Sequence, residues 1–248
     1  MYIFGGVTDD EISSDSKLDQ DDALALIRHY RSDPTVFGTR RHALLELAWH
    51  TGARASGLRA LDLRDMRETD DGQRYLAFVN REETGTRLKK GNDGERPVRI
   101  SEETWSALNR YVEHHRIEQW DEHGRQPLLT SRVGRPTPGT IRDWMYLATI
   151  PCLHSRCPHE RDPDTCEFTE YDHASGCPSS RSPHEVRTGA ITWMRNKGKP
   201  AEAVAERVNA KVETIEKHYD KEDSITEMIE RRDPYFSGFD IDSESDNE

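Results

Sequence analysis

Apolar residues recur at helical spacing along most of this chain. Their pattern predicts helices over 18–33, 39–52, 54–66, 101–117, 138–149, 183–195, 200–209, 212–219 and 224–232. Two short runs, 74–80 and 96–100, are rich in aromatic and β-branched residues and predict strands. The segment between them, 81–95, is rich in turn residues and predicts a hairpin. We therefore expect a mainly α fold with a small antiparallel β-sheet, in the α+β class.

The stretch "RSPHEVR" (181–187) has the residues of a well-capped helix start. Ser182 is a favourable N-cap, proline follows at the first helical position, and Glu185 completes an S-x-x-E capping box. His184 and Arg187 are then three residues apart on one face of the first turn. Free backbone N–H groups at a helix N-terminus favour an anion there. A phosphate site and a solvated helix start with incidental charges are both compatible with this pattern.

Two further stretches carry candidate chemistry. In "HTGARASGL" (50–58), Gly52 ends a helix and Arg54 follows on a rigid elbow, either as a functional cation or as a surface arginine. In "ERVNAKVETIEKHYDK" (206–221), Tyr219 continues the helical spacing of apolar residues, so it is either a core aromatic or a nucleophile. A phenol with a pKa near 10 needs a base or nearby cations to attack.

The charge distribution divides the chain into a central domain and two acidic ends. The net charge is −12, but residues 1–22 carry seven acids and one lysine, and residues 236–248 carry five acids and no base. The predicted organisation is an acidic disordered segment at 1–16, one domain at 17–235 and an acidic disordered tail at 236–248. A nearly neutral domain can still present a basic cleft to nucleic acid. The acidity also suggests adaptation to concentrated salt.

No apolar run is long enough for a transmembrane helix, and the N-terminus has no basic start or cleavage site of a signal peptide. We therefore expect a soluble, cytoplasmic protein without a membrane partner.

Together these stretches resemble the tyrosine recombinase (phage integrase) family, in a form like the integrases of halophilic archaea. The family's Thr-Gly-x-Arg motif falls on "TGAR" with Arg54, and its hairpin lysine on "LKKGNDGERPVRI" with Lys90. Its His-x-x-Arg motif falls on "PHEVR" with His184 and Arg187, and its tyrosine on "KHYDK" with Tyr219. The match covers about residues 17–221 and implies the tyrosine recombinase catalytic-domain fold.

The resemblance implies DNA recombination and integration, as in mobile elements, without a catalytic cofactor. Tyr219 would form a 3′-phosphotyrosyl intermediate, and Arg54 and Arg187 would clamp the scissile phosphate. Lys90, with Lys89 as its rival, would protonate the leaving oxygen, and His184 would assist proton movement. The implied partners are double-stranded DNA and further copies of the chain in a tetrameric synapse.

Three departures from the family pattern favour an alternative function. Gly57 replaces the acidic residue that usually follows the first arginine, and Asn209 stands where a histidine or tryptophan is usual. The resemblance also implies an N-terminal DNA-clamping domain, of which we expect almost none in the sequence at hand. The alternative is a catalytically impaired, zinc-stapled DNA-binding module of the same fold. The five matching residues oppose it.

All four cysteines fall within one segment of 26 residues inside a predicted insertion at 150–180. They are Cys152, Cys157, Cys166 and Cys177, interleaved with His154, His159 and His173. Clustered cysteines in a segment without periodicity predict a structural zinc site, first with all four cysteines as ligands and second with a cysteine–histidine mixture. Free thiols and disulfides are the alternatives. A metal-dependent hydrolase is disfavoured, because no open three-ligand site with a partnered carboxylate stands out.

Overall fold

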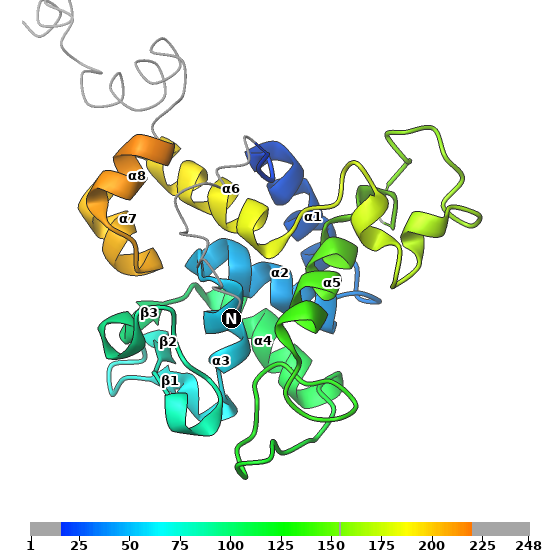
Figure 1. Ribbon diagram of the computed structural model, residues 1–248. Coiled ribbons are helices and arrows are strands. Elements are labelled where there is room, and N and C mark those ends of the chain that lie inside the picture. Colours follow the sequence, from blue (N-terminus) through cyan, green and yellow to red (C-terminus); the bar gives the residue numbers. More distant parts are fainter. Residues whose placement is uncertain (1–15, 154, 220–248) are drawn as a thin grey trace, which may run out of the picture.

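The buried helix α2 (Arg40–Thr51) lies at the centre of the computed structural model, which describes residues 16–153 and 155–219. Its residues from 42 to 49 are all buried, so the helix is enclosed on every side. The helices packed against it are α1 (Gln20–Ser32), α4 (Glu102–His114), α5 (Pro138–Thr149) and α6 (Pro183–Asn196) (Figure 1). Among the described helices, none has the length and apolarity needed to cross a bilayer.

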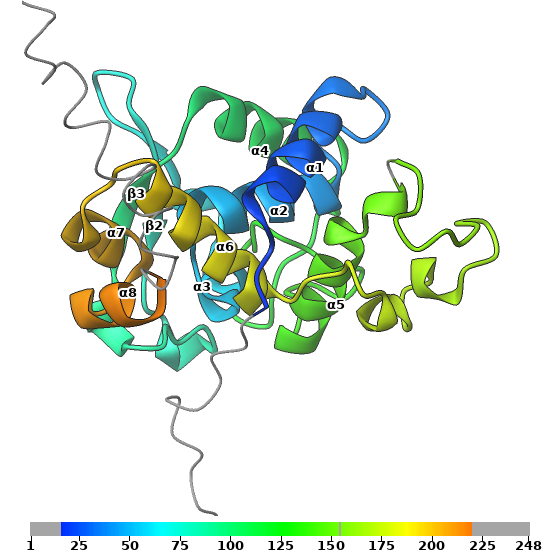
Figure 2. The ribbon, with the colours of Figure 1, turned by 90° about the horizontal axis from the view of Figure 1, so that it is seen from above.

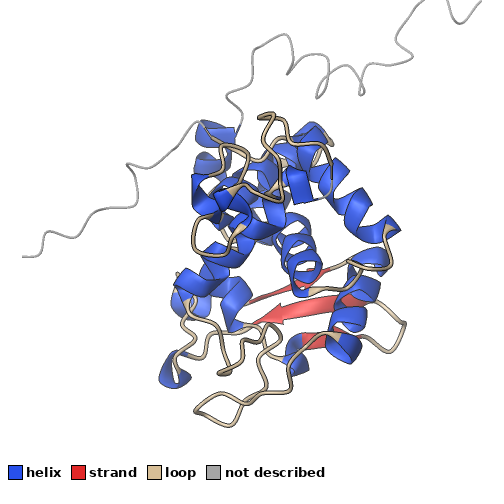
Figure 3. Ribbon diagram, turned by 90° about the vertical axis from the view of Figure 1, so that its right-hand side faces the viewer, coloured by secondary structure: helices blue, strands red, loops and turns tan. Residues whose placement is uncertain are grey.

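A three-stranded antiparallel sheet lies at one end of this helical body (Figure 3). Its strands are β1 (Met66–Glu68), β2 (Arg74–Phe78) and β3 (Arg96–Arg99), in that order. Leu76 pairs with Val98, and both side chains are buried in the main core. The two longer strands and the hairpin between them confirm the prediction. Strand β1 was not predicted, because it has only three residues and none is fully buried.

The last described helices form a second, smaller core. Helices α7 (Ala201–Val208) and α8 (Val212–Tyr219) pack on each other and on α6. Ile191, Val204 and Ile215 are buried between these three helices. The short helix α3 (Ala55–Ala60) lies elsewhere in the chain, directly after α2. Seen from above, α7 and α8 lie beside the sheet (Figure 2). The predicted helix at 224–232 and most of the two acidic ends lie outside the described residues.

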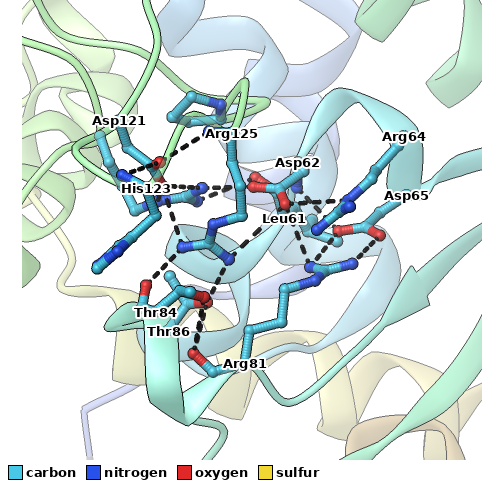
Figure 4. Close-up of polar contacts among 12 residues, drawn as sticks. Leu61, Asp62, Arg64, Asp65, Arg81, Thr84, Thr86, Asp121, His123 and Arg125 are labelled. Atoms are coloured by element: carbon cyan, nitrogen blue, oxygen red, sulfur yellow. Dashed lines mark hydrogen bonds and ion pairs between the residues drawn. The ribbon is translucent and has the colours of Figure 1, made fainter.

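A buried ionic network fastens the hairpin to the body (Figure 4). Asp65 accepts two hydrogen bonds from the guanidinium of Arg81, at 2.8 and 2.5 Å, and is fully buried. Neighbouring Asp62 forms ion pairs with Arg125 and Arg135, which reach it from the loop after α4. These contacts tie the chain after α3, the hairpin and that loop to one another, and so fix the base of the hairpin.

The segment 150–180 forms a separate lobe, on the opposite side of the body from α7 and α8 (Figures 1 and 2). It contains short 3-10 helices at Pro151–Leu153, Glu167–Thr169 and Ala174–Gly176. Thr149 and Arg181 close its base: the Arg181 amide donates to Thr149 Oγ1 at 2.8 Å, and that hydroxyl donates to the Arg181 carbonyl at 3.3 Å. We call this pair the neck of the insertion.

Candidate active site

Arg187 is held inside the protein by main-chain oxygens. Its side chain is on α6 and is only 3% exposed. One guanidinium nitrogen donates two hydrogen bonds. The first goes to the carbonyl of Gly52, at the end of α2, and the second goes to the carbonyl of Val208, at the end of α7, at 2.8 Å. Gly52 adopts a left-handed backbone with φ of 59°, and an added Cβ would lie 2.7 Å from Val208 Cγ1. Arg187 therefore joins three helices at one point.

Arg54 also donates a hydrogen bond to the end of α7. It is the N-cap residue of α3 and donates to the carbonyl of Asn209 at 2.9 Å. Asn209 itself has a left-handed backbone, with φ of 53°, and ends α7. The two arginines are thus anchored by the consecutive carbonyls of Val208 and Asn209. The two arginines therefore contact neighbouring peptide groups at the end of α7.

The Ser182 cap places the first turn of α6 as the sequence predicts. Ser182 Oγ accepts from the Glu185 amide at 3.3 Å, and the Glu185 carboxylate accepts from the Ser182 amide at 2.7 Å. This reciprocal pair is the capping box, and it leaves His184 exposed in the first turn. The pKa of His184 is lowered by partial burial and by the charges of Arg187 and Arg54. His184 therefore lies in the field of both arginines.

Lys90 brings the hairpin into this group. It is exposed and precedes the 3-10 helix Gly91–Gly94. Its pKa is lowered by burial, then by the charges of Arg54, Lys211 and Arg187. Lys89 acts in turn on His184, whose pKa its charge helps to lower. Both lysines thus lie close to the cluster, and Lys90 lies in the field of both arginines.

Two basic residues of this cluster were not singled out from the sequence. Arg96 on β3 donates to the Arg207 carbonyl at 2.7 Å and lies over the Phe78 ring at 4.4 Å. Burial and the charges of Arg54 and Arg207 lower its pKa to about 10. Lys211, just before α8, acts on Lys90. The usable signal for Arg96 was strand alternation in "RPVRI", which puts this arginine and the buried Val98 on the same face of β3.

The fifth predicted residue, Tyr219, is the last residue of α8. Its side chain lies outside the described residues, so its predicted role stays a prediction. The helix that carries it is well placed, however, because α8 packs against α6 and α7, and Ile215 is fully buried there. Tyr219 therefore ends a helix that packs against α6, the helix that bears Arg187.

The departures at Gly57 and Asn209 have structural counterparts. A Cβ added at Gly57 would lie 3.3 Å from the Phe78 ring, so that ring occupies the space an acidic side chain would need. Carbonyl groups hold the arginines instead of a carboxylate at that position. Asn209 contributes its carbonyl to Arg54, and its Nδ2 would lie 3.0 Å from a Cβ on Gly94 in the hairpin. Asn209 thus links the end of α7 with the hairpin that carries Lys90.

The model of the phage integrase family matches residues 16–224. The chain belongs to the phage integrase family. Several solved structures are similar to it, and at the low identities involved they show a shared fold. XerA recombinase is 18% identical with a TM-score of 0.58, and the match covers 94% of this chain and 67% of that one.

Two structures solved with DNA give a similar result. XerH site-specific recombinase bound to a palindromic difH substrate is 13% identical with a TM-score of 0.55, over 92% of this chain and 54% of that one. The Tn1549 transposon integrase in complex with circular intermediate DNA is 17% identical with a TM-score of 0.57, over 90% and 68%. This integrase-family chain thus spans about half the length of XerH. No curated protein matches it.

The cluster of this integrase-family chain is suited to bind a phosphodiester. Burial and the charges of neighbouring cations lower the pKa values of Lys90, Arg96 and His184, so positive charges are crowded together in this cluster and repel one another. An anion among them would relieve that repulsion, and guanidinium groups bind phosphate oxygens with two parallel hydrogen bonds. Held in place by the protein core, such donors stabilise charge that develops in a transition state.

Proposed function

We propose that this protein is a site-specific DNA recombinase that breaks and rejoins DNA through a 3′-phosphotyrosyl intermediate at Tyr219. The observation that carries the proposal is the convergence of Arg54, Lys90, His184 and Arg187 from three separate elements, namely the start of α3, the hairpin and α6. Double-stranded DNA is the proposed partner, supported by similarity to recombinases solved with DNA. The chain would self-associate on DNA into a synapse of four copies.

In the proposed reaction, the Tyr219 phenolate oxygen attacks the scissile phosphorus, and the bond from phosphorus to the 5′-oxygen breaks. Arg54 and Arg187 neutralise the non-bridging oxygens as negative charge grows on them. Lys90 donates a proton to the leaving 5′-oxygen, and His184 assists in removing the phenol proton. Attack by a 5′-hydroxyl on the phosphotyrosine reverses these steps and rejoins a strand. The phosphotyrosyl bond conserves the energy of the phosphodiester, so no external energy source is required.

A nicked suicide substrate tests the proposal, because loss of the short 5′-hydroxyl strand traps the covalent adduct. We expect an adduct that survives denaturing electrophoresis with the unmodified protein and none with Tyr219→Phe, while DNA binding is retained. Tyr171→Phe is the matched control, since Tyr171 is exposed on the insertion and outside the cluster. Normal adduct yield from Tyr219→Phe contradicts the proposal.

A DNA-binding module that does not cut is the second candidate, favoured by Gly57 and Asn209. It predicts specific DNA binding by the unmodified protein with no adduct on any suicide substrate that contains the bound site. The same assay therefore separates the two functions.

The choice between Lys90 and Lys89 needs a different substrate. A sulfur atom at the 5′-bridging position leaves without a proton, so it bypasses the general acid. We expect Lys90→Ala to lose cleavage of ordinary DNA and to regain it on the sulfur-containing DNA. Lys89→Ala is the control and should cleave both. Rescue of the Lys89 variant instead would transfer the role to Lys89.

A further inference from the structure

We infer that the insertion is a zinc-binding lobe in which Cys152, Cys157, Cys166 and Cys177 hold one structural Zn²⁺ ion. This inference is independent of the proposed recombinase activity, because the lobe lies on the opposite side of the body from α7 and α8 (Figure 1). It rests on how the four side chains are packed and bonded.

Three of the thiols share one small core. Cys152, Cys157 and Cys177 are 7–9% exposed and pack in a single cluster with Leu147, Ile150 and Ala174. The fourth, Cys166, is half-buried, and its charge acts on Cys152 together with the charges of the other two thiols. All four are free thiols in the structure, so the disulfide alternative does not describe it. Soft sulfur ligands match the preference of zinc.

The bonding around Cys157 suits a thiolate ligand. The backbone N–H groups of His159 and Arg161 both donate to its sulfur, and the Cys152 thiol is hydrogen-bonded to it as well. The turn that follows Cys157 thus already supplies the outer hydrogen bonds that orient a metal ligand.

The histidines of the insertion are placed less well than the cysteines to act as zinc ligands. His159 and His173 are exposed, and His159 Nε2 is hydrogen-bonded to Ser179 Oγ at 2.9 Å, whereas His154 lies outside the described residues. Within the described part of the chain, no group of three or more cysteine, histidine or acidic side chains is arranged to hold a metal ion. Binding of zinc would therefore draw the thiols together, and the buried positions of three of them favour the all-cysteine set.

The lobe is also too small to be stable without a cross-link or a metal ion. Segments below about 40 residues rarely bury enough apolar surface to fold alone, and metals or disulfides usually supply the difference. The insertion core consists of the small cluster around the cysteines. Cys177 is connected to the neck by two local contacts. Ser180 Oγ donates to the Cys177 carbonyl at 2.9 Å, and the next residue, Arg181, donates through its amide to Thr149 Oγ1. The next residue is Ser182, the cap of the helix that bears His184 and Arg187. Zinc would thus order the approach to that helix.

Metal analysis of the full-length protein tests the inference. Protein prepared in reductant, reconstituted with zinc and freed of excess is expected to retain about one zinc per chain by mass spectrometry of the metal. Replacement by Co²⁺ should give the intense near-ultraviolet charge-transfer bands of cobalt thiolates. Cys166→Ser and Cys177→Ser should each lose at least tenfold in zinc affinity, whereas His159→Ala and His173→Ala should keep it.

Three outcomes overturn the inference. They are a reconstituted protein with four reduced thiols and no retained zinc, retention of zinc by the cysteine variants, and loss of zinc by a histidine variant. Limited proteolysis gives a readout that needs neither DNA nor activity. Removing zinc with a chelator should speed cleavage within 150–180 and leave the body intact, and adding zinc back should reverse it. Equal cleavage of the two forms contradicts the stapling role.

Discussion

Arg54 and Arg187 are anchored by carbonyl oxygens of adjacent residues, those of Asn209 and Val208. A carbonyl carries only a partial negative charge, so it orients a guanidinium without neutralising it. The end of α7 therefore fixes where each of the two arginines sits. The peptide between Val208 and Asn209 is thus a shared support for the two cations.

The two arginines are expected to differ in their structural role. Arg187→Met removes the donor of two carbonyls at a site that is 3% exposed, and unpaired buried polar groups cost about 1–3 kcal/mol in the free energy of unfolding. Arg54→Met frees one carbonyl at a more exposed site and should cost less. Both variants should lower the rate of adduct formation about 100-fold or more. Urea denaturation and the suicide-substrate assay check this, and equal stability losses would contradict it.

Arg81 is expected to fix the hairpin that carries Lys90. Arg81→Met leaves the carboxylate of Asp65 buried without its bidentate partner, which costs about 3–5 kcal/mol in the free energy of unfolding. Arg87→Met is the matched control on the same hairpin, because its ion pair with Glu82 is exposed and contributes less than about 1 kcal/mol. Denaturant unfolding of both variants measures the difference. A similar small loss in each would show that the buried network does not hold the hairpin.

Replacing each of two helical glycines by alanine is expected to change the free energy of unfolding in opposite directions. A Cβ at Gly189 in α6 would collide with the carbonyl oxygen of Leu18, so Gly189→Ala should lower the free energy of unfolding by about 1–3 kcal/mol. In α5, the nearest atom to a Cβ at Gly139 is 3.7 Å away, so Gly139→Ala should be neutral or stabilising by up to about 1 kcal/mol. Thermal unfolding distinguishes them. Equal stability of the Gly189 variant and the unmodified protein would mean that residues around Leu18 do not rest on α6.

Stability is expected to fall as pH drops from 6.5 toward 4 because of His50. Its Nε2 accepts from the Ser101 amide at 3.1 Å, and burial, aided by the charge of Arg207, lowers its pKa from 6.5 to about 4. Within that window the unfolded chain binds a proton that the folded protein does not, so the stability is complete above pH 6.5 and decreases below it. The effect of this one group is at most about 3 kcal/mol.

The variant His50→Gln keeps an acceptor for Ser101 and cannot titrate, so its stability should depend less on pH. The free energy of unfolding measured at pH 7, 6, 5 and 4.5 gives the comparison. Glu46 contributes only at the acid end of this series, because its stabilisation is lost as pH falls from its ordinary pKa of 4.5 to its folded pKa of about 2. His184→Gln is a useful control, since that histidine is exposed and its lowered pKa acts in the same direction with smaller effect. Parallel pH curves for His50→Gln and the unmodified protein would exclude His50 as the cause.

Local signals predicted the helices and the longer strands, because caps and periodicity act over a few residues. The capping box at Ser182 and the left-handed end of α2 at Gly52 formed as expected. The carbonyl anchors of the arginines were beyond prediction, because any residue has a carbonyl and only the tertiary fold decides which one faces a guanidinium. The same holds for Arg96, whose neighbours Phe78 and Arg207 come from distant parts of the chain. The pairing of Asp65 with Arg81 was hidden for the same reason.

Because Thr149 and Arg181 are bonded to each other at the neck, the chain between them can vary in length without moving either residue. Because the hydrogen bonds across the neck hold the end of α5 beside the start of α6, residues between them add or remove a side lobe without changing the spacing of those helices. Loop closure costs only about 0.6 kcal/mol for each doubling of length. A family member can therefore acquire, enlarge or discard a lobe at this point, and inherit the rest of the architecture unaltered.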